Sequence, residues 1–147
     1  MQVFPLSLEE QAAGFSHKVV IKHDDLTETS AGAAQVIQAV GVNPGDLVVA
    51  CAARVVTAFK DASDAAFNTT AVTVGDGGDP DRFLASQETN ANGSTVTAKG
   101  GANTTPYAYT AADTIDVTVN SQTGKALANI DTGELHIFLK IIPLASL

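Results

Sequence analysis

The stretch DTIDVTVN, residues 113–120, alternates between polar and apolar side chains from Thr114 to Asn120. Because successive side chains of a β-strand point to opposite faces, this period of two predicts a half-buried strand. Its buried face is expected to carry the apolar residues Ile115, Val117 and Val119. Its outward face is expected to carry the polar residues Thr114, Asp116 and Thr118.

The same period appears on both sides of this stretch. GELHIFLKII (133–142) places Leu135, Ile137, Leu139 and Ile141 on one face, and FSHKVVIKH (15–23) places Phe15, His17, Val19 and Ile21 together. LVVACAARVVTAF (47–59) is apolar on both faces, which is typical of a central strand covered on both sides. Three long strands are therefore predicted besides 113–120.

Shorter segments complete the pattern. TSAGAAQVIQAVGVNPGD (29–46) fits a helical spacing as well as a strand, but the turn Asn43-Pro44-Gly45 follows at once and favours a strand. Further strands are predicted at AVTV (71–74), RFLAS (82–86) and STVTAK (94–99), and Asn92-Gly93 is a hairpin signal. The segment 121–133 is predicted to be a loop with one helical turn.

Seven or eight strands with turn signals about every ten residues predict an all-β fold. We expect an antiparallel β-sandwich of the jelly-roll type, formed by one domain over residues 15–147. Residues 1–14 show no clear period and are predicted to form an extended N-terminal arm.

Composition excludes several classes of function. The 147 residues are 45% hydrophobic, enough for a globular core, and carry a formal charge of −8. Lys or Arg never occurs twice within three positions, so a nucleic-acid partner is not expected. No apolar run reaches the roughly 20 residues of a membrane span, and no signal peptide is recognisable, so we expect synthesis in the cytoplasm and no membrane partner.

The loop in VTVGDGGDPDRF (72–83) is the main candidate for a site. Its spacing does not match an EF-hand, and its carboxylates would repel a phosphate. Gly, Asp and Pro are the residues of tight turns, so a structural corner is the favoured interpretation. A nonstandard calcium site formed by Asp76, Asp79 and Asp81 is the weaker alternative.

No catalytic residues and no cofactor are predicted. His17, His23 and His136 do not converge in the sequence, although a cupin-like metal site would form if distant strands joined His17 and His136. Cys51, the one cysteine, lies in an apolar run and is expected to be a buried, inert thiol. The chain is therefore expected not to be an enzyme.

The chain resembles small virion structural proteins of tailed bacteriophages, of the capsid decoration or cement class. The resemblance is carried by four segments in order: VNPGDLVV (42–49), VTVGDGGDPDRFL (72–84), TPYAYTAADTIDVTV (105–119) and TGELHIFLKIIPL (132–144). It implies a non-enzymatic protein on the outer surface of the virion head that clamps neighbouring subunits of the major capsid protein. It also implies self-association, as a homodimer or a homotrimer.

The apolar N-terminal segment Val3, Phe4, Pro5 and Leu6 is the predicted partner contact, because an extended arm can add a strand to a neighbouring sheet. It would otherwise cover the end of its own sandwich. The alternative function is a receptor- or carbohydrate-binding module of a phage tail or fibre. That function would use the polar loops near 86–106, with Tyr107 and Tyr109 as the available aromatic side chains.

Overall fold

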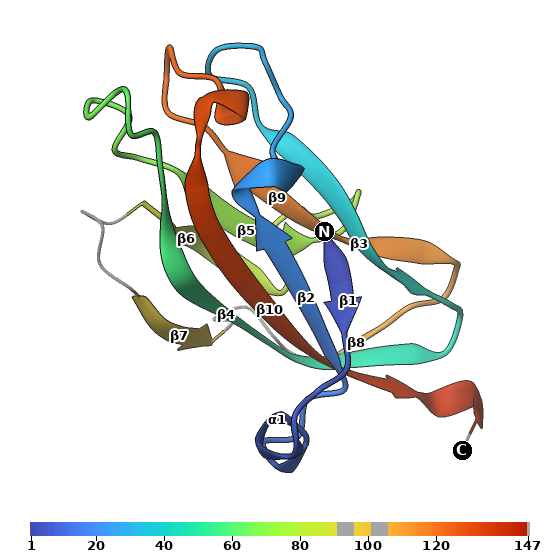
Figure 1. Cartoon of the computed structure of the whole chain (residues 1–147). Coiled ribbons are helices and arrows are strands. Elements are labelled where there is room, and N and C mark those ends of the chain that lie inside the picture. The colour runs from blue at the N-terminus through green and yellow to red at the C-terminus, as the bar shows by residue number, and fades with distance from the viewer. Residues whose placement is uncertain (91–95, 101–105, 147) are drawn as a thin grey trace.

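The computed structural model describes residues 1–146 except 91–95 and 101–105, and the side chains of 96–100 and 146 are not described. The predicted Asn92-Gly93 hairpin therefore lies outside the described residues. Two antiparallel sheets pack face to face, and the described part of the chain contains one short α-helix (Figure 1). The prediction of an all-β sandwich is confirmed. No helix among the described residues is long and apolar enough to cross a membrane.

Six strands form the larger sheet. Five of them lie in the order β1 (Gln2–Phe4), β2 (His17–Lys22), β10 (Thr132–Pro143), β4 (Asp46–Lys60) and β7 (Val96–Gly100), and β8 (Tyr107–Ala108) also pairs with β4. Four strands form the smaller sheet. Their order is β3 (Gln35–Val42), β9 (Asp113–Asn120), β5 (Ala71–Gly75) and β6 (Leu84–Glu88).

The strand order identifies the topology as a jelly roll. The chain crosses between the sheets after β2, β3, β4, β6, β8 and β9, so that the order β2-β10-β4-β7 faces the order β3-β9-β5-β6. This nesting of antiparallel pairs across two sheets is the double Greek key of that fold. The ambiguous segment before Asn43 is the strand β3, as the following turn indicated.

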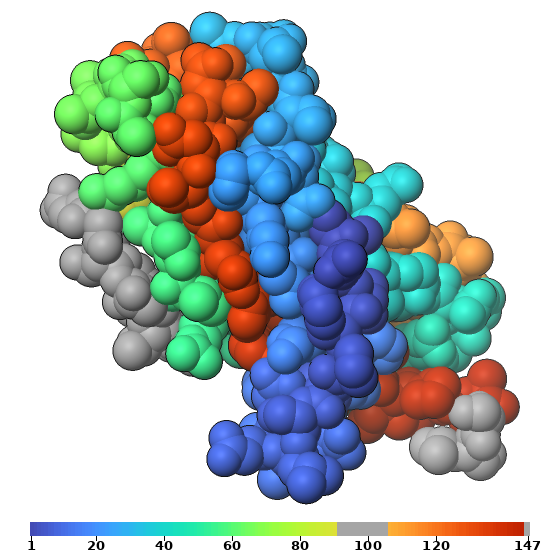
Figure 2. All heavy atoms as spheres, viewed as in Figure 1, coloured from blue at the N-terminus to red at the C-terminus, as the bar shows by residue number. Residues whose placement is uncertain are grey.

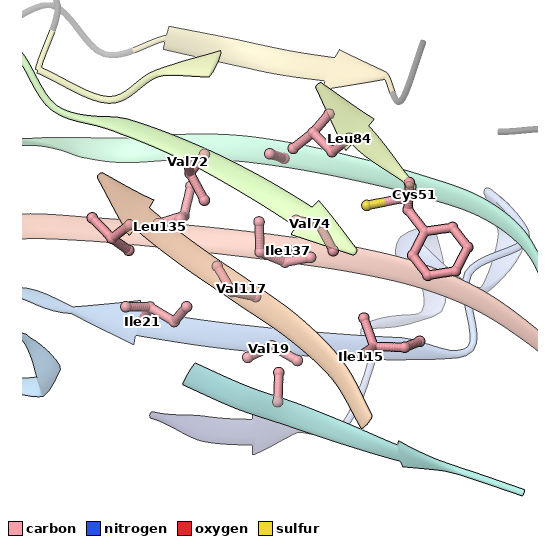
Figure 3. Close-up of a cluster of buried hydrophobic side chains, with 14 of the residues drawn as sticks. Val19, Ile21, Cys51, Val72, Val74, Leu84, Ile115, Val117, Leu135 and Ile137 are labelled. Atoms are coloured by element: carbon pink, nitrogen blue, oxygen red, sulfur yellow. The ribbon is translucent and has the colours of Figure 1, made fainter. Parts of the chain in front are cut away.

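The core lies between the sheets and includes the predicted alternating residues of β9 and β10, together with Val19 and Ile21 of β2 (Figure 3). Ile115, Val117, Leu135 and Ile137 are completely buried, as are Val19 and Ile21 from β2. The longest ladder joins β10 to β4, in which Ile137 lies opposite Ala53. The predicted helical turn in the loop 121–133 is the 3₁₀ helix Leu127–Asn129.

Asp116 is buried although it lies on the predicted outward face. It shares that face with Thr114, as expected, but the residue is only 8% exposed. It lies on the central strand β9 between Gln38 and Gly75, and its carboxylate accepts a hydrogen bond from the hydroxyl of Thr114 (2.7 Å). Neighbouring strands on both sides shield this carboxylate.

The N-terminal segment is only partly extended. Gln2–Phe4 form β1, which pairs antiparallel with β2, but Leu8–Ala12 form the helix α1. The helix begins at Ser7, whose hydroxyl accepts from the N–H of Glu10 (3.2 Å), while the Glu10 carboxylate accepts from the N–H of Ser7 (2.7 Å). This reciprocal capping satisfies two backbone donors, which is why a short helix forms where an extended arm was predicted.

Candidate functional site

The loop between β5 and β6 is a tightly closed corner. The N–H of Asp76 donates to the carbonyl of Asp79 (3.0 Å), and the N–H of Phe83 donates to the carbonyl of Val74 (2.9 Å). A Cβ atom at Gly75 would lie 2.0 Å from the carbonyl oxygen of Asp79, so only glycine permits this approach. The favoured interpretation of the loop as a structural corner agrees with this geometry.

Asp76 is the acceptor at the centre of the corner. Its carboxylate accepts from the backbone N–H of Gly78 (3.0 Å) and of Asp79 (2.9 Å). Arg82 donates to the same carboxylate from Nε (2.6 Å) and from a terminal guanidinium nitrogen (3.3 Å), and the hydroxyl of Tyr109 donates at 2.9 Å. Asp76 is 3% exposed, so its carboxylate is buried, and it is the acceptor in each of these five hydrogen bonds.

The electrostatics of this group follow from its burial and its partners. Burial by itself raises the pKa of Asp76, but the hydrogen bonds from Arg82 and Tyr109 outweigh it and hold the pKa below its ordinary value. The pKa of Tyr109 is raised, by burial first and then by its bond to the Asp76 carboxylate. Tyr109 therefore stays protonated and serves as a donor.

Aromatic rings complete the cluster. The guanidinium carbon of Arg82 lies 4.0 Å from the ring centroid of Tyr107, a cation–π distance. The rings of Tyr107 and Tyr109 meet edge to face with centroids 5.0 Å apart, and Phe83 lies within 6.4 Å of both. The two tyrosines thus pack within their own molecule, beside a small cavity of about 190 Å³.

The predicted calcium ligands are arranged differently from a cation site. Asp76 uses its oxygens for backbone donors, Arg82 and Tyr109, and the Asp79 carboxylate lies 4.0 Å from the Arg82 guanidinium. Across the described residues, no group of three or more His, Cys, Asp or Glu side chains is placed to hold a metal ion. The carboxylates of Asp76 and Asp79 are organised around an arginine.

The histidines are dispersed. His17 lies opposite Leu139, and His136 lies opposite Val20, so the two histidines have opposite parity in the same ladder and belong to opposite faces of the sheet. The Nε2 atom of His136 lies 2.7 Å from a Glu134 oxygen, and the Nδ1 atom of His23 lies 3.0 Å from Asp24. A cupin-like site built from His17 and His136 has no geometric support.

Cys51 lies on β4 and is buried, as predicted. Burial raises the pKa of its thiol to about 12. A thiol with this pKa is almost entirely protonated at neutral pH and is a poor nucleophile.

The predicted partner contact lies on the molecular surface. Val3 is 54% exposed and Phe4 is 37% exposed, Pro5 is exposed, and Leu6 is half-buried. Leu8, at the start of α1, is 83% exposed. Among the described residues, β2 is the only strand that pairs with β1, so the other edge of β1 is open.

Besides the pairing of β1 with β2, two ion pairs hold the N-terminal segment against the sandwich. The terminal amine of Met1 forms an ion pair with Asp25, and Lys18 of β2 donates to Glu10 of α1 (3.0 Å). The arm therefore covers part of its own sheet and still presents apolar side chains outward. Ser7-x-x-Glu10 is the sequence signal from which its helix was predictable.

The C-terminal segment differs from the N-terminal one. β10 runs to Pro143 and pairs with β4 over its whole length, from Thr132 opposite Lys60 to Pro143 opposite Asp46. It is an internal strand of the sheet, between β2 and β4, and Leu144 beyond it is 43% exposed.

No protein-family model matches this sequence, and no curated protein matches it either. Among solved structures, the chain is similar to a chain of the "acidic stable capsid structure of Helicobacter pylori bacteriophage KHP30". The two share 17% sequence identity with a TM-score of 0.49, over 88% of this chain and 90% of that chain. A likeness of this size does not transfer a role from one chain to the other.

Proposed function

We propose that this chain is a virion structural protein that decorates the outside of a bacteriophage head and cements neighbouring major capsid subunits. The observation that carries this proposal is the open edge of β1, with Val3 and Phe4 exposed on it and Leu8 exposed at the start of α1. An open sheet edge with apolar side chains is a template for pairing with another chain, here over the three residues of β1.

The contact would form by strand addition. An extended segment of the capsid subunit pairs with the free edge of β1 through main-chain hydrogen bonds, and Val3 and Phe4 supply the buried apolar area. Pro5 ends the strand, because it has no N–H to donate. This mode needs no deep pocket, and it suits a compact jelly roll whose own core is complete.

The bulk properties of the chain agree with such a role. A net charge of −8 keeps a small protein soluble at the concentrations that assembly requires, and the fold contains no disulfide among the described residues. Self-association as a dimer or a trimer on the capsid surface is part of the proposal. The capsid source of the similar solved chain is in accord with it but adds no weight at that level of similarity.

The carbohydrate-binding alternative has less support. Sugar stacking requires an accessible aromatic face, whereas Tyr109 is buried and Tyr107 is covered on one side by Arg82. We therefore retain the capsid contact as the single proposed function.

Cosedimentation with expanded, empty heads that lack this protein tests the proposal. We expect saturable binding at a fixed copy number per capsid subunit. The double variant Val3→Ser/Phe4→Ser should bind about 30-fold more weakly, since about 2 kcal/mol of apolar burial is lost. The matched control Val36→Ser removes an exposed valine (58% exposed) from β3 of the other sheet and should bind like the wild type.

Circular dichroism of each variant confirms that it is folded. Absence of saturable binding by the wild type would reject the capsid role. Equal loss in the β1 variant and the Val36 control would reject β1 as the contact.

A further inference from the structure

The charges of this chain are divided unequally between its two sheets. Of the eight Lys and Arg residues, six lie on strands of the six-stranded sheet and none on strands of the four-stranded sheet. The six are Lys18, Lys22, Arg54, Lys60, Lys99 and Lys140. The strands of the six-stranded sheet include two acids, Asp46 and Glu134, and those of the four-stranded sheet include three, Glu88, Asp113 and Asp116. An acidic protein therefore has one basic sheet.

Strand register places most of these cations on the same outer surface. Lys18 lies opposite Phe4 on β1 and opposite Phe138 on β10, and His136 lies opposite Arg54 on β4. These residues have the parity opposite to that of the core residues of β2 and β10. We call the surface formed by Lys18, Lys22, Arg54, His136 and Lys140 the basic face. Figure 2 shows the molecule from this side, with β2, β10 and β4 next to one another.

The basic face has an apolar centre. One shallow cavity of about 200 Å³ on this face is lined by Phe4, Lys18, Val20, Lys22, Glu134 and His136. Next to it, the ring of Phe138 lies 5.4 Å from that of Phe15 and 6.2 Å from that of His136, centroid to centroid. An apolar centre within a polar rim is the usual anatomy of a protein–protein interface.

Three of these five basic residues have no charged partner. Lys18 pairs with Glu10, and His136 pairs with Glu134. Lys22, Arg54 and Lys140 form no ion pair with any residue that the structure describes, and Lys22 and Arg54 are exposed. Unpaired cations around an apolar centre complement a surface that is acidic around an apolar patch.

We infer that the basic face is the surface that docks on the shell, and that its occupant is an acidic protein surface of the capsid subunit. This inference rests on the proposed function and adds to it the side of the molecule that faces the shell. The basic face is continuous with the β1 contact, because Phe4 of β1 lines the same cavity as Lys18 and Lys22. The four-stranded sheet, with exposed Gln38, Ser86 and Glu88, then faces solvent.

A protein fits this face better than a nucleic acid. Duplex binding relies on several phosphate contacts from clustered Lys and Arg, whereas two of the five groups here are already paired with carboxylates. The net charge of −8 also repels a long polyanion beyond the immediate contact. A folded acidic surface meets only the basic face and can also bury the apolar centre.

Head binding of two charge-matched variants tests the inference. Each of two double variants makes the net charge more negative by two. Lys22→Gln/Arg54→Gln changes the six-stranded sheet, and Gln38→Glu/Ser86→Glu changes the four-stranded sheet. All four positions are exposed. The first variant should bind heads about tenfold more weakly and with less dependence on salt. The second should bind like the wild type. Equal effects, or a larger effect of the second variant, would overturn the inference.

A second experiment separates this inference from the proposed function. Amide chemical shifts are followed while a soluble peptide of glutamate and leucine, and separately a short DNA duplex, is added to the wild-type chain. Peptide-induced shifts at Lys22, Arg54, His136 and Lys140 without head binding would show that the basic face takes an acidic, partly apolar surface, and would reject the capsid subunit as its occupant. Shifts confined to β3 and β9, or tighter binding of DNA than of the peptide, would overturn the inference.

Sedimentation velocity of the chain alone tests whether a second copy of this chain occupies the basic face. A monomer at the concentrations used for head binding is expected. A dimer that forms in the wild type at neutral pH and is lost in Lys22→Gln/Arg54→Gln would assign the face to a second copy of this chain and overturn the inference.

Discussion

Asp76 shows how a single residue connects distant parts of the chain. Its carboxylate joins the corner after β5 to Arg82, six residues later, and to Tyr109, 33 residues later. A buried acceptor with several donors stabilises the fold chiefly because its removal leaves those donors unsatisfied. The cluster is therefore expected to hold the loop between β5 and β6 against the loop between β8 and β9.

Asp76→Asn should lower the free energy of unfolding by about 2 kcal/mol, because the charge that Arg82 and Tyr109 contact is lost. Asp79→Asn is the matched control: the Asp79 side chain is 44% exposed and lies 4.0 Å from the guanidinium. It should change stability by less than about 0.5 kcal/mol. Urea unfolding at neutral pH measures both values. Equal losses of stability in the two variants would contradict the role of Asp76 in holding the two loops together.

The contribution of Asp76 should also depend on pH. Its pKa in the folded state is lowered, since the hydrogen bonds from Arg82 and Tyr109 outweigh burial, while the unfolded value is about 3.9. The ionised carboxylate therefore stabilises the fold fully above that unfolded value, and this stabilisation is lost as pH falls through the folded pKa. The difference in urea midpoint between the wild type and Asp76→Asn should shrink below about pH 4. A difference that stays constant down to about pH 2.5 would show that ionisation of Asp76 contributes nothing.

At the scale of elements, the corner between β5 and β6 depends on one glycine. Gly75→Ala would place a methyl group 2.0 Å from the Asp79 carbonyl oxygen and 2.5 Å from the carbonyl carbon of Pro80. Because backbone atoms must move, we expect a loss of about 3 kcal/mol in unfolding free energy.

Gly77→Ala in the same corner is the matched control, since an added Cβ meets nothing within 4 Å there. It should be neutral within about 0.5 kcal/mol. Thermal or urea unfolding distinguishes the two, and a destabilised Gly77 variant would indicate that the corner as a whole does not tolerate substitution.

The elements differ in how far the sequence predicts them. Long strands such as 113–120 and 133–142 follow from alternation, because one face is buried along their whole length. The helix α1 was missed, although Ser7-x-x-Glu10 is a recognisable capping pattern. The burial of Asp116 on the outward face was not predicted, because it depends on the flanking strands β3 and β5, which alternation within β9 does not encode.

The candidate sites were predictable only in part. The corner followed from its Gly, Asp and Pro content, but its pairing with Arg82 and Tyr109 depends on how the β8–β9 region returns to the sheet. The basic face required the strand order, since its cations come from three separate segments that only the jelly roll brings together. Single-sequence patterns carry no direct information on such long-range neighbours.

At the scale of the whole molecule, charge is separated between the two sheets. Near the isoelectric point of about 4.5 the net repulsion between copies disappears, while the basic face of one copy can still attract the carboxylates of another. We expect reversible association at that pH in about 0.02 M NaCl, and its loss in about 0.5 M NaCl, where charges are screened within a few ångströms. Sedimentation velocity in both salts measures this. Association that strengthens with salt would point to apolar contacts instead.

The buried thiol of Cys51 makes these surfaces accessible to fluorescence. It is the one cysteine of the chain, and burial raises its pKa to about 12, so a maleimide dye will leave it unmodified in the folded protein. A cysteine introduced at Lys22 or at Gln38 will then carry the only label, without removal of the native residue. Each dye reports on one sheet, so quenching on bound heads distinguishes the covered side of the molecule from the side left in solvent.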